Sequence, residues 1–470
     1  MTALLAGIDV GATTCRVGIY TADGAPVVER HRTTSTDAPT VVAGVLADLR
    51  HCLDAAGGPP LAVGITGGDG GVPLDRDLTP MTPLLLDDRA GAAAAWLAGE
   101  VGRTALFTTT GVDVAAGTPL ATWLWLRRQL PDTLDRMRVW ASLPDLVATA
   151  LCGTPLSHRT LAGRTGAYDQ RADRYDDDLL ALAGIRAGQL PAHRTGSAVA
   201  GPLPVGTPVV VTGHDHLVAA HAAGAREPGD VVDSLGAAEA VVTVSERVAP
   251  DAAAGTGTSW NRTADGTRWA LLSTFTELAE RPSGTVADSG RLLAWLCSLS
   301  SPAGDLAGLE RVAESVTTRP TGIVVLPYLG GRGAPSPAPE QRLTVHDLAP
   351  GQALPAVVVA ALEGASYHVR WLAEHHAEHA DTKLSSVTVL GGAGAGRTWL
   401  SVKAQVMPGP VRVTAVGAAA CAGAALLAGV ALGLPAPVLG SDVLPRDDLL
   451  ADRYDAIYRG GFLPRVREVA

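Results

Sequence analysis

Residues 5–20 decide the fold, and they read Leu5-Ala-Gly-Ile-Asp9-Val-Gly11-Ala-Thr13-Thr14-Cys-Arg16-Val-Gly-Ile-Tyr20. An apolar strand runs into Asp9, then into a short turn of small residues, and then into a second strand. Such a turn leaves backbone N–H groups free to face an anion. The carboxylate of Asp9 would repel a bare phosphate, so it indicates a divalent cation between the two, as in a Mg-nucleotide site. An ordinary hairpin with Asp9 at a strand end explains the same pattern equally well.

Length and composition favour a globular α/β protein that binds small molecules. At 470 residues the chain is too long for one core, which suggests two or three domains with a cleft between them. Its 54 glycines and 32 prolines predict many turns. The net charge of −10 argues against nucleic acid or an anionic membrane as partner, because both require surplus Lys and Arg. Five scattered cysteines with no CxxC pair predict a reducing, cytoplasmic setting.

Residues 413–441 contain no charged side chain, and this stretch is long enough to span a bilayer. It is rich in Ala and Gly and holds two prolines near its end, a composition that inserts weakly into membranes. Small residues instead permit close contact with neighbouring elements. We therefore predict a tightly packed buried helix here and no membrane span.

Strand-like and helix-like runs alternate along the chain. Strands are expected over residues 61–66, 207–212, 229–235, 240–244, 323–326 and 386–390, and helices over 117–128, 216–225 and 354–379. The alternation predicts α/β architecture with functional loops at the carboxyl ends of strands.

A second strand–turn–strand unit over residues 230–244 echoes the opening one. Two related halves, residues 1–224 and 225–470, would place a ligand in the cleft between them. The boundary is predicted near residues 223–229, where Gly-Ala-Arg-Glu-Pro-Gly breaks the preceding helix.

Gly213-His214-Asp215-His216 follows a strong strand and opens an Ala-rich helix. Asp215 stands where a helix N-cap belongs, so capping is one explanation. The other is a general base, because a carboxylate at a helix N-terminus stays ionised and can accept the proton of a sugar hydroxyl. His214 and His216 would then offer hydrogen bonds to neighbouring hydroxyls, or simply pack against the strand.

Two further patterns carry weaker signals. Residues 391–398 nearly spell a Walker A loop, but Arg397 replaces the phosphate-binding Lys and no Walker B aspartate follows, so a P-loop enzyme is disfavoured. His375 and His379 lie one helical turn apart and would suit a metal. Because no further ligand is evident, residues 374–379 are predicted to form a solvated helix surface instead.

Taken in order, these segments resemble the FGGY family of carbohydrate kinases, members of the actin-like ATPase superfamily. The segments that carry the resemblance are Gly7-Ile-Asp-Val-Gly11 through Arg16, Asp87-Asp-Arg89-Ala, Ala162-Gly-Arg-Thr165, Pro208 to Asp215, Leu235-Gly236, Leu326-Pro-Tyr-Leu-Gly-Gly-Arg332, Leu362-Glu-Gly364, Gly391-Gly392 and Ala422-Gly-Ala-Ala-Leu-Leu-Ala428. The resemblance implies an α/β fold of two actin-like (ribonuclease H-like) domains whose interdomain cleft closes on ATP, Mg²⁺ and a sugar. It is compatible with a homodimer.

The resemblance also implies roles for individual residues. It makes Asp215 the catalytic base and gives Asp9 the task of organising Mg²⁺ through water, with Asp215 beside the same metal. Nucleotide-binding residues implied by the resemblance are Gly11, Thr13, Thr14, Arg16, Gly236, Ala237, Gly391, Gly392, Ala393 and Arg397. Sugar-binding residues implied by it, or predicted beside it, are Asp69, Gly70, Asp87, Arg89, His214 and His216.

Several departures from the family pattern concern the sugar pocket. Thr66-Gly-Gly-Asp69-Gly-Gly71 stands where many relatives have Gln-Met-His-Gly, and Leu85 stands where a Trp is common. Ala12 and Ala237 replace threonines of the phosphate turns, and Glu239 is also unusual. The pocket is therefore predicted to be altered, with Asp69 as a hydroxyl acceptor.

The sequence predicts ATP-dependent phosphorylation of a sugar hydroxyl. A ketopentose such as xylulose is favoured over other ketoses, alditols and gluconate. The alternative is a catalytically silent regulator that binds sugar or nucleotide with the same fold, motivated by the lost motif residues. Retention of both Asp9 and Asp215 argues against that alternative.

Overall fold

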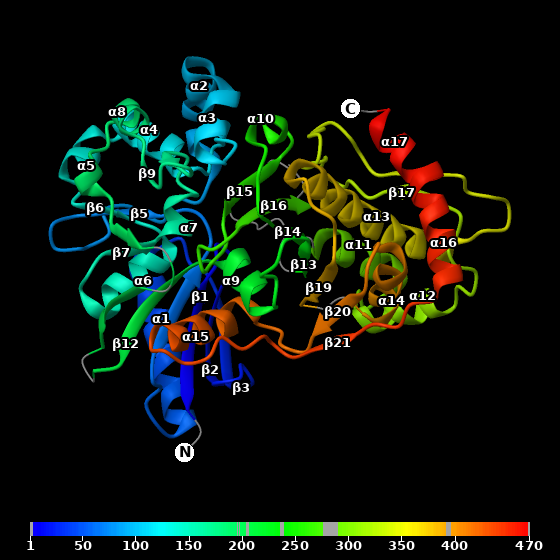
Figure 1. The fold of residues 1–470 in the computed structure, drawn as a ribbon, viewed down its shortest axis with the longest axis horizontal. Helices are drawn as coiled ribbons and strands as arrows, with labels where there is room; N and C mark the ends of the chain where they lie inside the picture. The colour runs from blue at the N-terminus through cyan, green and yellow to red at the C-terminus, as the bar shows by residue number, and fades with distance from the viewer. Residues whose placement is uncertain are drawn as a thin grey trace.

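The computed structural model describes residues 3–194, 196, 198–203, 206–235, 239–275, 290–391 and 396–468. Figure 1 shows two lobes side by side, each built around one large sheet. The first sheet has six strands in the order β11-β12-β4-β1-β2-β3, and the second has seven in the order β15-β16-β14-β13-β19-β20-β21. The predicted α/β class is confirmed by this architecture of two sheet-rich lobes.

The first lobe contains the first sheet and most of the helices that cover it. Its sheet strands are β1 (Leu4–Val10), β2 (Thr14–Thr21), β3 (Pro26–Thr33), β4 (Val63–Gly67), β11 (Ala198–Pro202) and β12 (Pro208–His214). Short strand pairs are β5 (Val72–Leu74) with β6 (Val139–Ala141), β7 (Leu156–His158) with β10 (Ala192–Arg194), and β8 (Tyr168–Asp169) with β9 (Arg174–Tyr175). Its helices are α1 (Ala38–Ala56), η1 (Asp88–Ala90), α2 (Gly91–Leu97), η2 (Ala98–Gly102), α3 (Arg103–Thr110), α4 (Pro119–Gln129), α5 (Pro131–Arg136), α6 (Leu143–Cys152), α7 (Arg159–Ala162), α8 (Asp177–Ala183), η3 (Ala187–Gln189) and α9 (Asp215–Ala222).

The second lobe is built on the second sheet. Its sheet strands are β13 (Asp230–Leu235), β14 (Glu239–Ser245), β15 (Thr258–Arg262), β16 (Trp269–Phe275), β19 (Ser386–Leu390), β20 (Val411–Thr414) and β21 (Ser441–Val443), and a separate pair is β17 (Val324–Leu326) with β18 (Thr344–His346). The helices of this half of the chain are α10 (Pro250–Ala253), α11 (Gly290–Ser300), α12 (Leu306–Glu314), α13 (Leu354–Ala380), α14 (Arg397–Val406), α15 (Ala419–Ala431), α16 (Asp448–Ile457), η5 (Tyr458–Phe462) and α17 (Leu463–Arg467).

Each predicted strand and helix coincides with an observed one, and only the ends differ. The predicted strands correspond to β4, β12, β13, β14, β17 and β19, and the predicted helices to α4, α9 and α13. Helix α9 stops at Ala222, earlier than predicted, because the chain turns at Gly224 with a φ of +91°.

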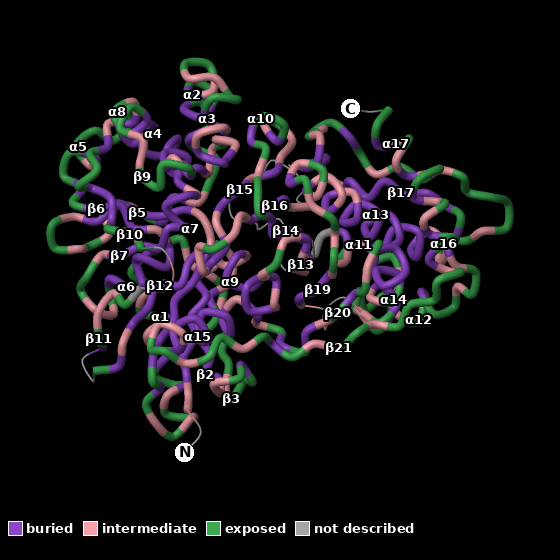
Figure 2. Tube along the Cα trace, in the orientation of Figure 1, coloured by how far each residue is buried: buried purple, intermediate pink, exposed green. Residues whose placement is uncertain are grey.

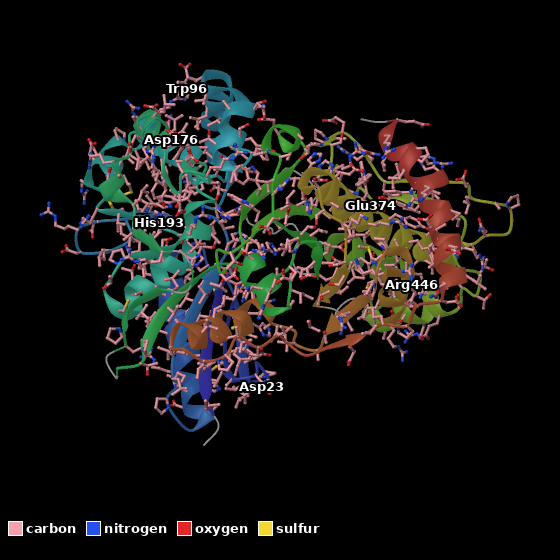
Figure 3. All side chains as sticks on the ribbon, in the orientation of Figure 1. Asp23, Trp96, Asp176, His193, Glu374 and Arg446 are labelled. Atoms are coloured by element: carbon pink, nitrogen blue, oxygen red, sulfur yellow. The ribbon has the colours of Figure 1, made fainter. Side chains whose placement is uncertain are left out.

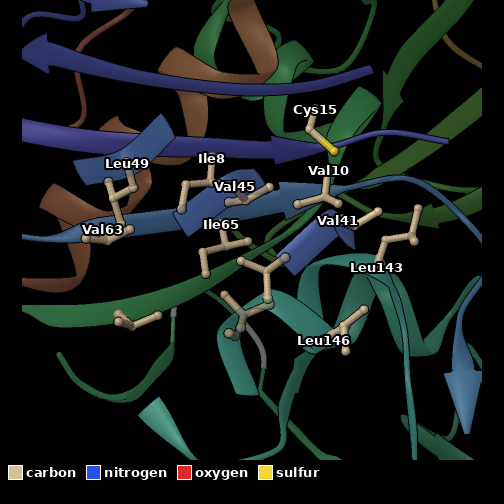
Figure 4. Close-up of a cluster of buried hydrophobic side chains, with 14 of the residues drawn as sticks. Ile8, Val10, Cys15, Val41, Val45, Leu49, Val63, Ile65, Leu143 and Leu146 are labelled. Carbon is tan, nitrogen blue, oxygen red and sulfur yellow. The ribbon is translucent and has the colours of Figure 1, made fainter. Parts of the chain in front are cut away.

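The core of the first lobe lies between its sheet and helix α1. Helix α1 places Val41, Val45 and Leu49 on one face, and Figure 4 shows them beside strand residues such as Ile8 and Ile65. The four-residue spacing creates that apolar face. These contacts fix β1, and with it the turn that follows, against a rigid base.

Helix α15 comes from near the C-terminus but packs on the first sheet. In Figure 1 it is orange and lies beside the blue strands β1 and β2, and it is largely buried in Figure 2. A Cβ built at Gly7 would lie 1.9 Å from the carbonyl oxygen of Cys421, and one at Gly64 would lie 1.9 Å from that of Ala424. The predicted close packing of this segment is confirmed, and in the described parts of the chain we find no helix with the length and apolarity to cross a membrane.

Because α15 packs on the first sheet, a domain boundary between residues 224 and 225 assigns this helix and the sheet that it covers to different domains. The described contacts also join the lobes elsewhere. The backbone N–H of Trp260 donates to the carbonyl of Gly111 at 2.9 Å, and the side-chain amide of Asn261 donates to the carbonyl of Thr160 at 2.9 Å. Strand β15 of the second sheet therefore reaches the first lobe.

The prediction of a solvated surface at residues 374–379 is wrong for most of the segment, because only Glu378 is exposed. Figure 3 labels Glu374 on α13, and its neighbour His376 is completely buried. The ring of His376 is hydrogen-bonded to the hydroxyls of Thr243 and Ser273, at 3.0 and 2.8 Å, because α13 packs against the second sheet. Within the described ranges, no group of three or more His, Cys, Asp or Glu side chains is arranged to hold a metal.

Candidate active site

Strand register brings the two acids singled out from the sequence to one edge of the first sheet. Thr66 of β4 pairs with Asp9 of β1 on one side and with Gly213 of β12 on the other. The Thr66 hydroxyl also donates to the Gly213 carbonyl at 2.7 Å. Neighbouring strands lie about 4.8 Å apart, so the ends of β1 and β12 are about 10 Å apart. Asp9 and Asp215 therefore start from the same carboxyl edge.

The geometry around Asp215 depends on a glycine before it. Gly213 has a φ of +122°, and a Cβ there would lie 2.6 Å from the Thr160 hydroxyl. His214 is the N-cap of α9, and Asp215 is its first residue, so the capping explanation for Asp215 does not hold. The Asp215 carboxylate accepts the His216 backbone N–H at 2.6 Å, and its other oxygen is 3.4 Å from the point where a Cβ of Gly68 would lie.

The surroundings of Asp215 favour its ionised form. Burial would raise the pKa of Asp215, but His214, His216 and the His216 backbone N–H together lower it below its ordinary value. Nδ1 of His214 lies 3.3 Å from Oδ1 of Asp215. Burial in turn lowers the pKa of His216. The Asp215 carboxylate is thus held in its charged form at neutral pH.

Asp9 is in a different electrostatic state. Only 5% of it is exposed, its Oδ1 has no hydrogen-bond partner among the described residues, and Arg16 approaches its Oδ2 at 3.7 Å. Burial, and then the charge of Asp215, raise the pKa of Asp9 to about 7, against the opposing effects of Arg16 and His214. A buried carboxylate oxygen without a donor fits a site that a hydrated cation completes.

The turn after Asp9 is a tight hairpin, as predicted. The Gly11 N–H is used inside the turn, where it donates to the Thr14 carbonyl at 3.2 Å. Thr34 of the loop after β3 fixes the turn from behind, through its hydroxyl to the Gly11 carbonyl and its N–H to the Thr13 carbonyl. As far as the described residues go, the N–H groups of Ala12 and Thr13 donate to no protein acceptor, so these two are the donors that an anion would meet.

Asp69 accepts hydrogen bonds from Arg164, a residue that the sequence analysis did not place in the site. Arg164 donates from Nη2 to Asp69 Oδ2 at 2.6 Å and from Nε to both carboxylate oxygens at 3.1 and 3.2 Å. Nε2 of His214 lies 3.5 Å from Asp69 Oδ1 on the side toward Asp215. Burial opposes ionisation of Asp69, yet Arg164 and His214 hold the pKa of this carboxyl far below its usual range.

A pocket opens beside this pair. The polar and charged side chains that line it are Asp69, Ser142, Asp145, Ser157, Arg164, Thr165 and Tyr175. Asp145 is 2% exposed, and its Oδ1 has no partner in the described part of the chain. Burial raises the pKa of Asp145 to about 6, although the nearby side chains of Ser142 and Ser157 oppose the shift.

Asp145 and Arg164 are the residues that the sequence analysis missed. Arg164 lies in the segment Ala162-Gly-Arg-Thr165, which the sequence analysis did single out. Its partner Asp69 is 95 residues away in the sequence, so the pairing itself could not be predicted. Asp145 forms a capping box with Ser142 at the start of α6, and this local role does not reveal that the residue also lines the pocket.

Asp87 and Arg89 lie apart from the pocket lining. Arg89 donates to Asp87 at 2.5 and 2.6 Å, and the guanidinium lies 5.2 Å from the ring centre of Trp125. Their segment still touches the sugar-site loop, because a Cβ at Gly70 would lie 2.2 Å from the Leu86 side chain. The pair therefore lies behind the loop that carries Asp69.

Four of the predicted nucleotide-binding residues, Gly236, Ala237, Gly392 and Ala393, lie outside the described residues. Gly391 has a φ of +72°, and a Cβ there would lie 2.2 Å from the Leu235 carbonyl oxygen, so β13 and β19 end against each other. Arg397 is mostly exposed and pairs with Glu314 at 3.0 Å.

The Walker A alternative does not fit this loop. The backbone N–H of Thr398, in the first turn of α14, donates to the Glu310 carboxylate, and the Thr398 hydroxyl donates to the same group at 3.1 Å. A carboxylate already occupies the place where a P-loop would bind phosphate.

The unusual Glu239 belongs to a buried ion cluster below the second strand–turn–strand unit. The Lys403 ammonium donates to Asp233 at 2.6 Å and to Glu239 at 2.7 Å, and all three side chains are 1% exposed. Burial, together with the charge of Asp233, raises the pKa of Glu239 to about 8 despite Lys403. One ammonium thus links β13 and β14, whose ends pair as Leu235 with Glu239.

Comparisons with known proteins agree with this arrangement. Models of the N-terminal and C-terminal domains of the FGGY family of carbohydrate kinases match residues 4–221 and 281–432. A xylulose kinase of Streptomyces rubiginosus is 28% identical over 408 residues, covering 81% of this chain and 77% of that protein. The crystal structure of xylulose kinase from Rhodospirillum rubrum superposes with a TM-score of 0.84 at 23% identity over 99% of both chains. Gluconate kinase from Lactobacillus acidophilus gives 0.87 at 18% identity, over 100% of this chain and 99% of that one.

Proposed function

The chain belongs to the FGGY family of carbohydrate kinases, and from that premise we propose that it transfers the γ-phosphoryl group of ATP to a hydroxyl of a ketopentose such as xylulose. That it is an ATP-dependent carbohydrate kinase follows from the family. The observation that carries the proposal is the meeting of Asp9 and Asp215 at one sheet edge, beside the pocket that holds Asp69. The similarity to a protein named xylulose kinase supports the choice of sugar.

Asp215 is the proposed general base. Its lowered pKa keeps the carboxylate ionised at neutral pH, so it is ready to accept a proton. As the sugar oxygen attacks, its proton passes to Asp215, a bond forms between that oxygen and the γ-phosphorus, and the bond from the γ-phosphorus to the β–γ bridging oxygen breaks to release ADP. Gly68 leaves open the space in front of Asp215 that the hydroxyl must enter. Phosphoryl transfer requires mainly this positioning together with charge neutralisation.

Asp9 and Asp215 are the side chains that we propose would hold Mg²⁺. Bound there, the ion would neutralise the charge that develops on the nucleotide phosphates. Asp9 fits this task because its buried Oδ1 lacks a donor. Arg16 stays close enough to limit the repulsion between Asp9 and phosphate.

The nucleotide is proposed to lie between the two lobes. The N–H groups at Ala12 and Thr13 would face its phosphates from the first lobe, and the loop after β19 would hold adenosine from the second. We propose residues 1–224 and 225–470 as the two domains. A cytoplasmic location and a homodimer stay predictions from the sequence.

A coupled ADP-release assay over ketoses, alditols and aldonates tests the proposal. Native protein should release ADP with ketopentoses, and Asp215→Asn, which keeps size but removes the base, should lower kcat by about 10²–10⁴-fold. Calorimetry should show that Asp215→Asn still binds the sugar. Sugar binding without turnover in the native protein would instead identify a silent regulator.

A further inference from the structure

The pocket beside Asp69 contains a cation, Arg164, and each of its three guanidinium nitrogens already donates a hydrogen bond. Arg164 sends Nε and Nη2 to the two oxygens of Asp69, and its Nη1 donates to the Ser259 hydroxyl at 2.9 Å. Its side chain is 20% exposed, whereas that of Asp69 is 38% exposed. A ligand that enters the pocket therefore meets the carboxylate more readily than the guanidinium.

The remaining charges of the pocket are acidic. Among the described lining residues the charged side chains are Asp69, Asp145 and Arg164, so acids outnumber the single cation. The Oδ1 atom of Asp145 is buried and has no donor among the described residues. Hydroxyl groups can donate to both carboxylates, but a second carboxylate in the same space would face like charge in a poorly solvated site.

From these charges and contacts we propose that the pocket selects uncharged polyhydroxylated sugars over sugar acids. Asp69 is the specificity-determining residue, because its carboxylate accepts the hydrogen bonds that Arg164 could otherwise donate to a sugar acid. The inference rests on the proposed function, since it concerns the substrate class of the same site. It adds that Arg164 is a latent carboxylate receptor. An Arg fork matches a carboxylate in the bidentate manner that Asp69 already displays, so an aldonate would take over those donors if Asp69 were absent.

The decisive variant is Asp69→Ser, which removes the competing carboxylate and leaves room beside Arg164. We expect gluconate and xylonate to bind the native protein weakly and to bind this variant about 30-fold or more tightly by calorimetry. The efficiency with neutral ketoses should fall at the same time, because a hydroxyl acceptor is lost. Asp69→Asn, which keeps the size of the side chain, is the second variant if Asp69→Ser does not fold.

Two matched controls separate this mechanism from simple charge removal. Asp145→Asn removes the same amount of charge from the same pocket but leaves Arg164 engaged, so aldonate binding should stay weak. Asp69→Ser combined with Arg164→Met should lose the gain that Asp69→Ser shows alone.

The inference is overturned if the native protein binds aldonates as well as neutral sugars, if neither Asp69 variant gains affinity, or if Asp145→Asn gains as much. Calorimetry needs no turnover. A native protein that phosphorylates no neutral sugar would therefore refute the proposed function while the binding comparison still decides this inference.

Discussion

Asp9 and Asp215 interact electrostatically across strand β4. They emerge from β1 and from the end of β12, on either side of Thr66, and the charge of Asp215 helps to raise the pKa of Asp9 to about 7. The fold therefore keeps one acid ionised and the other close to neutrality. Two acids with pKa values pushed apart are suited to different tasks.

Asp9→Asn should weaken the response to Mg²⁺ and stabilise the protein. The half-saturating Mg²⁺ concentration should rise by about tenfold or more, as expected when a ligand or its orienting partner is lost. The raised pKa means that the fold disfavours the ionised form of Asp9, so native stability falls as pH rises from about 4 through 7. The melting temperature of the variant should exceed that of native protein more at pH 8 than at pH 5.

The matched control for Asp9 is the same substitution at exposed Asp54, which should change neither property. An equal gain in melting temperature at both pH values would contradict the electrostatic explanation for Asp9.

Lys403→Met should destabilise the second lobe. It leaves Asp233 and Glu239 buried without their cation, and breaking a buried ion pair from one side costs about 3–5 kcal/mol. Urea unfolding should show the loss, and adding Glu239→Gln should recover part of it. Lys383, the other lysine of the chain, is exposed, so Lys383→Met should have little effect. Equal urea midpoints of unfolding for the two lysine variants would refute the importance of the buried Lys403 cluster for stability.

Gly64→Ala should displace helix α15 from the first sheet. The added Cβ would lie 1.9 Å from the Ala424 carbonyl oxygen, and backbone on both sides leaves no flexible group to move. We expect a loss of about 3 kcal/mol or more, seen as a lower melting temperature or as insoluble protein. Gly58→Ala, with no atom within 4 Å of its Cβ, should behave like native protein. A fully stable Gly64→Ala would mean that α15 does not pack as described.

Glu363→Gln should remove part of the pH dependence of stability. Burial raises the pKa of Glu363 to about 7, although Thr321 and Tyr454 donate hydrogen bonds to it. The folded protein therefore holds this proton where the unfolded chain releases it, so native stability declines between about pH 4.5 and 7. Relative to the variant, native protein should lose about 3 kcal/mol from pH 4.5 to 8, measured by urea unfolding. Glu340→Gln, at a highly exposed side chain, should show no such difference.

The sequence was sufficient to predict the elements whose signals lie within a few residues of one another. The strand that ends at Asp9, the glycine before His214 and Asp215, and the strand over residues 386–390 were all readable, because hydrophobic period and turn residues act within a few positions. His376 was misread for the same reason. Its buried partners Thr243 and Ser273 lie on strands more than a hundred residues earlier, so nothing in the neighbouring sequence indicated that it is buried.

By itself, the sequence determined the fold class, the family and the two acids that end strands β1 and β12. Tertiary structure alone decided what surrounds them: the Arg164 fork on Asp69, the unpartnered oxygen of Asp145, the Lys403 cluster and the return of α15 to the first sheet. The physical reason is that motifs specify backbone geometry over short distances. Charge balance and burial depend on which distant side chains the packed core brings into contact.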